Sequence, residues 1–456
     1  MTTDRLAPPR VASVAARLLA NEAAALLTRL DQLRPFVLSE TMVLAAALPY
    51  RAHRAIERFL HERRVELRHR VRDFLYWLGG PGAETDAAEQ QRRFVAIRMG
   101  FNDVLSQLDL FAEVITQRSE AQTGVWLSGL DRLAADALTV PEQWIPDPPP
   151  LICYLARGPG AAIRRARTRL PGGQPSPVGI LRIPRERMIG HGVASSVVHE
   201  VGHQAAALLD LVEPLRTELT ARARGRSQRA WTGWANTVSE CIADFWSVAK
   251  LGVSSTLGLL GVVSLPRFFV FRPPGVDPHP MPYVRVMLSA AVGNLLYPHQ
   301  QWEQLAQVWQ SYYPAEHLDD DARQVIAELV HTAPAMAESM AEHRPKLLRG
   351  HTLADILVDQ SRRPEALLAS YDRWDNDIGV LSRQPPTLVF AAVGQARAAG
   401  RIEPATESSL LANVLTTWAM RSSIDVLERD ECRTPPSTIS DTTISDTTWR
   451  QRHGTQ

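Results

Sequence analysis

The chain has 456 residues, 45% of them hydrophobic and 22% charged, with 50 basic against 49 acidic side chains. This composition is ordinary for a soluble globular protein, and the length allows two or three domains, or one large domain with added helices. The net charge of +1 gives no overall attraction to nucleic acid or to an acidic membrane.

Three cysteines, Cys153, Cys241 and Cys432, lie far apart in the sequence and form no CxxC pair. Their spacing excludes a disulfide framework and a thiolate zinc site, and it suits a reducing compartment. We therefore expect a cytoplasmic protein.

Residues 1–140 are expected to form an N-terminal helical region. The apolar runs near the N-terminus are broken by Arg17 and Glu22, which indicates a first helix of the mature protein rather than a signal peptide. Apolar side chains recur at three- and four-residue spacing over residues 51–78. After a glycine-rich turn, a second helical run follows at about 89–117.

The helix expected at residues 51–78 is basic, because residues 51–73 hold eight arginines against four acids. Nucleic-acid binding is one interpretation of this charge. We favour a solvated polar face, because the acids are interleaved and no stacking aromatic residues line the basic side. We therefore expect no nucleic-acid partner, while the helical regions remain candidate docking surfaces for a protein partner.

The proline-rich residues 140–150 cannot continue a helix and indicate a seam between domains. Two short strands are expected after this seam, at residues 151–155 and 178–183. Helical periodicity then resumes from about 193 to 428. The fold class expected is therefore mainly α with a small β-sheet (α+β).

This pattern divides the chain into an N-terminal helical region (1–140), a core (141–300), a C-terminal helical region (301–430) and a tail (431–456). The tail is polar, has few apolar residues to bury and is expected to be disordered. Within the core, the apolar residues 251–266 are 16 in number. That is short of the roughly 20 needed to cross a bilayer, so we favour a buried helix over a membrane segment.

An HExxH motif lies in the segment VVHEVGHQ, residues 197–204. Residues four apart lie on one face of a helix, so His199 and His203 can both direct an imidazole at one metal ion. Glu200 follows the first histidine, where its carboxylate can take a proton from a zinc-bound water. The alternative is a core helix with two hydrogen-bonded histidines.

A third ligand can come from the segment SECIADFW, residues 239–246. Glu240 and Asp244 are four apart, so on a helix their carboxylates share a face while apolar neighbours pack into the core. Glu240 then fits a metal ligand, and Asp244 fits a carboxylate that orients a ligand histidine through its free ring N–H. The alternative is an ordinary acidic helix face.

HExxH followed by E-x-x-A-D resembles the gluzincin clan of zinc metallopeptidases and, within it, is loosely similar to the HtpX and CAAX-prenyl-protease group. The resemblance covers about residues 178–285. It implies a zincin-like catalytic core, flanked here by the two helical regions. In that core His199, His203 and Glu240 would bind zinc, Glu200 would be the general base, and Asp244 would orient a ligand histidine. The chain lacks the clear transmembrane helices of those relatives, so we do not expect their membrane location or prenylated substrates.

The segment DPHPMPYVR, residues 277–285, extends the resemblance, because that group often has a His-Pro element and an arginine here. The resemblance thus implies His279 or Arg285 at the active site. The functional interpretation of His279, Tyr283 and Arg285 is that they stabilise the oxyanion that develops on the scissile carbonyl. The alternative is a proline-rich turn in which His279 caps a helix and Arg285 pairs with a surface acid. His191 is either a further polar group near the site or, as we favour, a capping or solvent-facing histidine.

Two further segments gain meaning from the motif. The strand expected at residues 178–183 precedes the motif helix, where zincins commonly have an edge strand that pairs with an extended substrate. The arginine-rich residues 222–229 are a lid or a subsite for acidic side chains or, as we favour, an exposed loop.

The function expected is that of a soluble zinc-dependent endopeptidase acting on a protein or peptide substrate, with Zn²⁺ as its cofactor. One alternative is a non-catalytic, metal-stabilised scaffold or sensor, whose site His191 or Cys241 would close. Another is a membrane-associated protease resembling the HtpX group.

Overall fold

The computed structural model describes residues 13–32, 43–141, 143–157, 160–185, 190–223, 227–272 and 278–431. Helices dominate these residues, and the strands form one small sheet, which confirms the predicted class. Beyond Glu431, the tail expected to be disordered, with Cys432 in it, lies outside the described residues.

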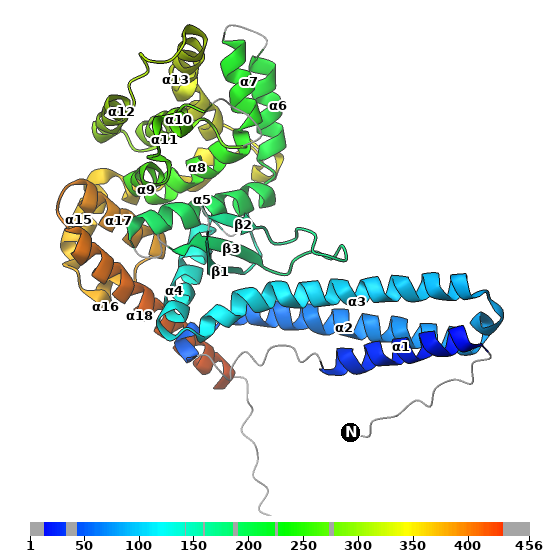
Figure 1. Ribbon diagram of the computed structural model, residues 1–456. Coiled ribbons are helices and arrows are strands. Elements are labelled where there is room, and N and C mark those ends of the chain that lie inside the picture. Colours follow the sequence, from blue (N-terminus) through cyan, green and yellow to red (C-terminus); the bar gives the residue numbers. More distant parts are fainter. Residues whose placement is uncertain are drawn as a thin grey trace, which may run out of the picture.

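Three N-terminal helices form an arm that extends from the body of the molecule (Figure 1). They are α1 (Val14–Gln32), α2 (Tyr50–Gly79) and α3 (Ala87–Thr116), and they share a hydrophobic core of their own. The 30 residues of α2 correspond to about 45 Å of helix. A 3₁₀ turn over Pro81–Glu84 breaks the chain at the predicted glycine-rich turn, and Asp86 caps α3 by accepting from the Glu89 N–H.

The sheet has the strand order β1-β3-β2, with β1 (Leu151–Ala156), β2 (Ala162–Arg164) and β3 (Gly179–Pro184). β1 runs parallel to β3, and β2 runs antiparallel to it. Both strands predicted from the sequence are confirmed, whereas β2 was not predicted. The expectation that residues 178–183 form an edge strand was wrong, because β3 lies between two partners and β2 occupies the edge.

Both faces of the central strand β3 are covered. Leu181 and Ile183 pack into the main core of the body, while Ile180 joins a second cluster with Ile56 of α2 and Phe111 of α3. This second cluster fixes the base of the arm to the sheet.

The body is built from short and medium helices around a single hydrophobic core, which runs from Leu127 to Trp418. The residues expected as a central core and as a C-terminal region therefore share one core, and α4 belongs to it as well. In chain order the helices of the body are α4 (Ala121–Ala137), α5 (His191–Leu208), α6 (Val212–Arg222), α7 (Gln228–Asn236), α8 (Val238–Leu251), α9 (Val253–Val263), α10 (Arg267–Val270), α11 (Pro282–Leu296), α12 (Gln301–Tyr312), α13 (Asp320–Ala341), α14 (Leu353–Leu357), α15 (Pro364–Trp374), α16 (Ile378–Leu381), α17 (Pro386–Ala398) and α18 (Pro404–Glu431).

The apolar residues 251–266 form a buried helix and its flanks, as expected. Gly252, with a φ of 56°, ends α8 and turns the chain into α9, much of which is buried in the main core. Across the described ranges, no helix is both long enough and apolar enough to cross a membrane.

Candidate metal centre

The site is built where α5 and α8 cross at very close range. Gly202 of α5 makes this approach possible, because a Cβ at that position would lie 2.9 Å from the Cα of Ala243 and 3.1 Å from the Cβ of Trp246. The crossing turns the HExxH face of α5 toward the acidic face of α8.

Glu240 of α8 lies between the two histidines of the motif. Its Oε2 is 3.2 Å from Nε2 of His199, and its Oε1 is 3.4 Å from Nε2 of His203. The two imidazole rings stand almost perpendicular, with their centroids 5.0 Å apart. A single carboxylate therefore faces both motif histidines.

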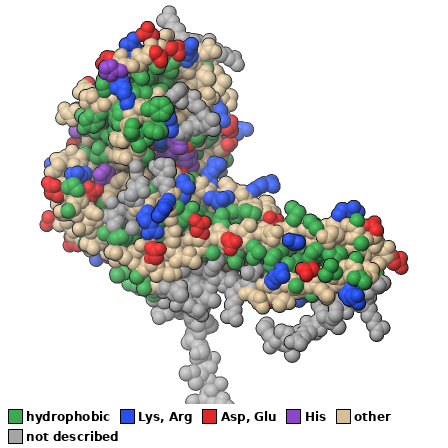
Figure 2. Space-filling model, viewed as in Figure 1, with side chains coloured by type: hydrophobic (Ala, Val, Ile, Leu, Met, Phe, Trp, Pro, Cys, Tyr) green, Lys and Arg blue, Asp and Glu red, His purple; other side chains and the backbone are tan. Residues whose placement is uncertain are grey.

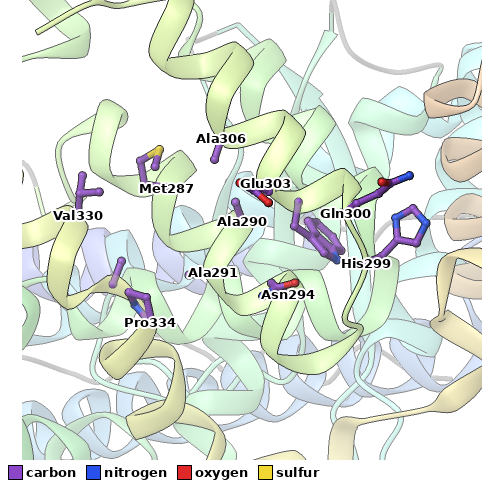
Figure 3. Close-up of a pocket in the computed structure, with 12 residues that line it drawn as sticks. Met287, Ala290, Ala291, Asn294, His299, Gln300, Glu303, Ala306, Val330 and Pro334 are labelled. Atoms are coloured by element: carbon purple, nitrogen blue, oxygen red, sulfur yellow. The ribbon is translucent and has the colours of Figure 1, made fainter.

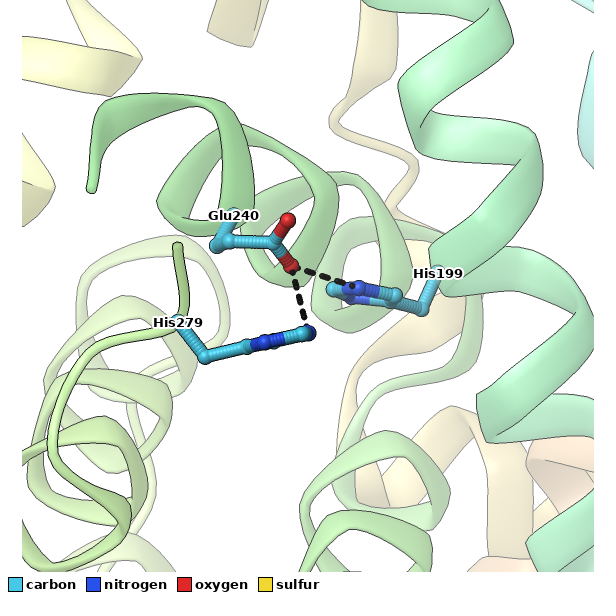
Figure 4. Close-up of side chains that lie close together, drawn as sticks. All are labelled: His199, Glu240 and His279. Carbon is cyan, nitrogen blue, oxygen red and sulfur yellow. Dashed lines mark hydrogen bonds and ion pairs between the residues drawn. The ribbon is translucent and has the colours of Figure 1, made fainter. Parts of the chain in front are cut away.

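His279 reaches the same carboxylate from the segment that precedes α11 (Figure 4). Its Nε2 is 3.2 Å from Oε2 of Glu240. His199, Glu240 and His279 offer ligand atoms that all lie within 4.8 Å of one another, and within the described part of the chain they are the group that could hold a metal ion. His203 lies outside this group, although it contacts the other oxygen of Glu240.

Asp244 and Arg285 support His199 from behind. Oδ1 of Asp244 is 2.8 Å from Nδ1 of His199, which leaves Nε2 of that ring directed at Glu240. Arg285 donates from Nε to Oδ2 of Asp244 at 2.6 Å and from Nη2 to Oδ1 at 2.8 Å. Nη2 of Arg285 also lies 3.3 Å from Nδ1 of His199, so the guanidinium contacts both Asp244 and the imidazole that Asp244 orients.

A serine supports the second motif histidine. Oγ of Ser239 lies 3.3 Å from Nδ1 of His203. Sequence reasoning missed this contact. The one sequence feature that could have indicated it is that Ser239 directly precedes Glu240 on the same helix.

The charges of the site are coupled. Burial alone would raise the pKa of Glu240, but hydrogen bonds from His199 and His203 outweigh it and hold that pKa well below its usual range. For Asp244, Arg285 and His199 likewise outweigh burial and lower the pKa of the carboxyl. Burial would lower the pKa of His199, but Asp244 and Glu240 prevail and raise it to about 9. The site thus holds two carboxylates ionised, and these carboxylates favour the protonated form of His199.

Glu200 is only 8% exposed, and no described residue forms a hydrogen bond or ion pair with its carboxylate. A buried carboxylate without a protein partner is available to a water molecule or to a substrate.

The other polar residues that the sequence placed near the motif point elsewhere. His191 begins α5, and its Nδ1 lies 2.6 Å from Oε1 of Glu407 in α18. Cys241 is fully buried beside Thr237, and burial raises the pKa of its thiol. Tyr283 packs its ring on Phe271 with centroids 5.0 Å apart.

A separate pocket of about 300 Å³ lies between α11, α12 and α13 (Figure 3). Its walls are largely apolar, with Asn294, His299 and Glu303 among the polar side chains. It contains none of the residues of the candidate metal centre.

The donor set fits zinc. Imidazole nitrogens and a carboxylate oxygen are ligands that zinc takes in catalytic sites, and a histidine held through its second nitrogen by a carboxylate is a common accompaniment. Comparisons with protein-family models, with curated proteins and with solved structures gave no match.

Proposed function

We propose that this chain is a zinc-dependent peptidase whose ion is held by His199 and Glu240 together with His203, His279 or both. The observation that carries the proposal is that Glu240, on a separate helix, faces both histidines of an HExxH motif. Cysteine usage further supports action in the cytoplasm.

When bound, zinc supplies Lewis acidity, which polarises a substrate carbonyl and acidifies a water molecule. The rest of the chemistry falls to the side chains of this chain. Glu200 accepts the proton of the attacking water and delivers it to the leaving nitrogen. Asp244, itself held by Arg285, fixes the orientation and the tautomer of His199.

The substrate backbone is held by β2. Within the described residues, one edge of this strand pairs with β3 and no strand pairs with the other. An extended peptide can add to such an edge through backbone hydrogen bonds. The sequence suggested β3 as the strand that pairs with the substrate backbone, and we now propose β2 for this role.

The test combines zinc content with cleavage by the full chain. We expect about one zinc per chain and cleavage of an unstructured protein such as casein. Glu200→Gln keeps the carboxylate's shape but cannot accept the proton, so it should retain zinc and lose cleavage by about 100-fold or more. Cleavage at the parental rate by this variant would refute the mechanism.

His279 favours a second candidate function, a metal-stabilised scaffold. If His199, His203, Glu240 and His279 all bound one ion, the site would be closed and no position would remain for water. Substitution of the native zinc by cobalt distinguishes the two functions. A spectrum that changes when a hydroxamate inhibitor is added indicates an open position, and an unchanged spectrum favours the scaffold.

A further inference from the structure

The segment around β2 carries an unbalanced positive charge. Residues 151–185 hold seven arginines and no aspartate or glutamate. Within the described residues, Arg185 pairs loosely with Glu120 at 3.8 Å, and no ion pair neutralises the exposed arginines Arg157, Arg164, Arg165, Arg167 and Arg169. Figure 2 shows basic side chains gathered between the histidines of the body and the arm.

This basic segment runs along the helix that carries the motif. The backbone N–H of Ala166 donates to Oε1 of Gln204 at 2.7 Å, and Gln204 directly follows His203. Arg165 and Arg167 flank Ala166, and Arg164 is the last residue of β2. The arginines therefore lie on the segment that is hydrogen-bonded to the motif helix.

We propose that this surface selects acidic peptide segments, which add to the free edge of β2 and set Asp or Glu side chains against Arg164, Arg165 and Arg167. Charge complementarity at a strand edge gives both the alignment and the selectivity. The catalytic consequence, cleavage beside acidic residues, rests on the proposed peptidase function. Binding of the peptide does not.

Nucleic acid fits this surface less well. Proteins that hold single strands stack bases on exposed aromatic side chains. Tyr154 is the only aromatic residue in residues 151–185, and it is half-buried in β1. The segment thus offers charge and a backbone edge without a stacking platform.

The test measures binding without catalysis, using the full chain with Glu200→Gln. The probes are two fluorescein-labelled ten-residue peptides, one with Glu and one with Gln at alternate positions, followed by fluorescence anisotropy. We expect the acidic peptide to bind about tenfold more tightly, since each exposed charge pair contributes roughly twofold. The difference should shrink at high salt.

Two triple variants locate the effect. Arg164→Gln, Arg165→Gln and Arg167→Gln together should abolish the preference for the acidic peptide. The control removes the same charge from exposed positions of α2 in the arm, with Arg54→Gln, Arg58→Gln and Arg72→Gln, and should preserve the preference. Circular dichroism and zinc content verify that both variants are folded.

Three outcomes would overturn the proposal. Equal affinity for the two peptides would show that the surface is not selective. An equal loss of the preference in the control variant would show that the preference comes from the net charge of the protein and not from the arginines near β2. The third outcome is that a ten-nucleotide single strand binds more tightly than the acidic peptide and that this binding is lost in the β2 variant. The surface would then be assigned to nucleic acid.

Cleavage separates this proposal from the peptidase function. Sites cut by the zinc-loaded parent in a proteome-derived peptide library should be enriched in Asp and Glu on either side of the broken bond. Cleavage without that enrichment refutes acidic selection and leaves the peptidase intact. Selective binding without any cleavage refutes the peptidase and leaves the acidic surface intact.

Discussion

The pair Asp244–Arg285 offers the sharpest test of how the site is held. Arg285 donates twice to Asp244, at 2.6 and 2.8 Å, and both side chains are at most 10% exposed. Asp244→Asn removes the charge that compensates the guanidinium, whereas Arg285→Met removes the guanidinium and leaves Asp244 its contact with His199. The double variant removes both charges at once.

The expected magnitudes follow from these contacts. Asp244→Asn leaves a buried guanidinium uncompensated, which costs about 3–5 kcal/mol in the free energy of unfolding. Arg285→Met costs less, about 1–3 kcal/mol, because His199 still contacts Asp244. The double variant should lose about 2 kcal/mol less than the sum of the single losses, since neither charge is left alone.

The assay is urea denaturation in the presence of a chelator, so that loss of metal does not enter the comparison. Tryptophan fluorescence is a suitable probe, because most of the described tryptophans belong to the main core, Trp246 of α8 among them. Losses that add to within about 0.5 kcal/mol would show that the two side chains do not interact, and the reasoning would be wrong. A loss below about 1 kcal/mol for Asp244→Asn would mean that the pair behaves like an exposed one.

Three further outcomes are expected. Gly202→Ala inserts a methyl group between α5 and α8 and should destabilise the fold by about 1–3 kcal/mol and weaken zinc binding in a chelator competition. Gly233→Ala in α7, where the nearest atom outside the helix is a Leu329 methyl at 3.5 Å, should leave zinc binding unchanged and should not destabilise the fold, because alanine is the better helix former. Removing zinc with EDTA should lower stability by about 2.7 kcal/mol when free zinc had been 100 times its Kd; an unchanged urea midpoint would argue against a folded-state site. Burial lowers the pKa of Lys250 from 10.5 to about 8, so its charged form destabilises the fold below about pH 8 and this penalty fades toward pH 10.5. Over that window the parent should gain stability relative to Lys250→Met, and parallel pH profiles would exclude the effect.

Local patterns account for what the sequence predicted well. The arm helices follow from apolar periodicity, and β1 and β3 follow from short apolar runs bounded by loops. His199 and Glu200 are adjacent on one helix, so their relation needs no knowledge of the fold. Glu240 could be proposed because its helix is apolar except on one face.

Features set by tertiary structure could not be predicted. β2 has only three residues and lies within an arginine-rich stretch, so it carries no alternating pattern. The order of the strands depends on which edges pair, and pairing with both β1 and β2 places β3 in the centre rather than at the edge. Likewise, His279 belongs to an irregular segment, so spacing alone could not bring its ring to Glu240.

The contact between His191 and Glu407 bears on when the centre is completed during synthesis. Glu407 accepts from the backbone N–H of His191 at 2.8 Å, and it lies 216 residues further along the chain. The first turn of α5 therefore lacks this partner until α18 has left the ribosome. Translation proceeds from the N-terminus, so a nascent chain carries every candidate ligand long before the helix that bears the motif is fully anchored. The capping of the first turn of the motif helix therefore waits for a residue that lies 216 positions further along the chain.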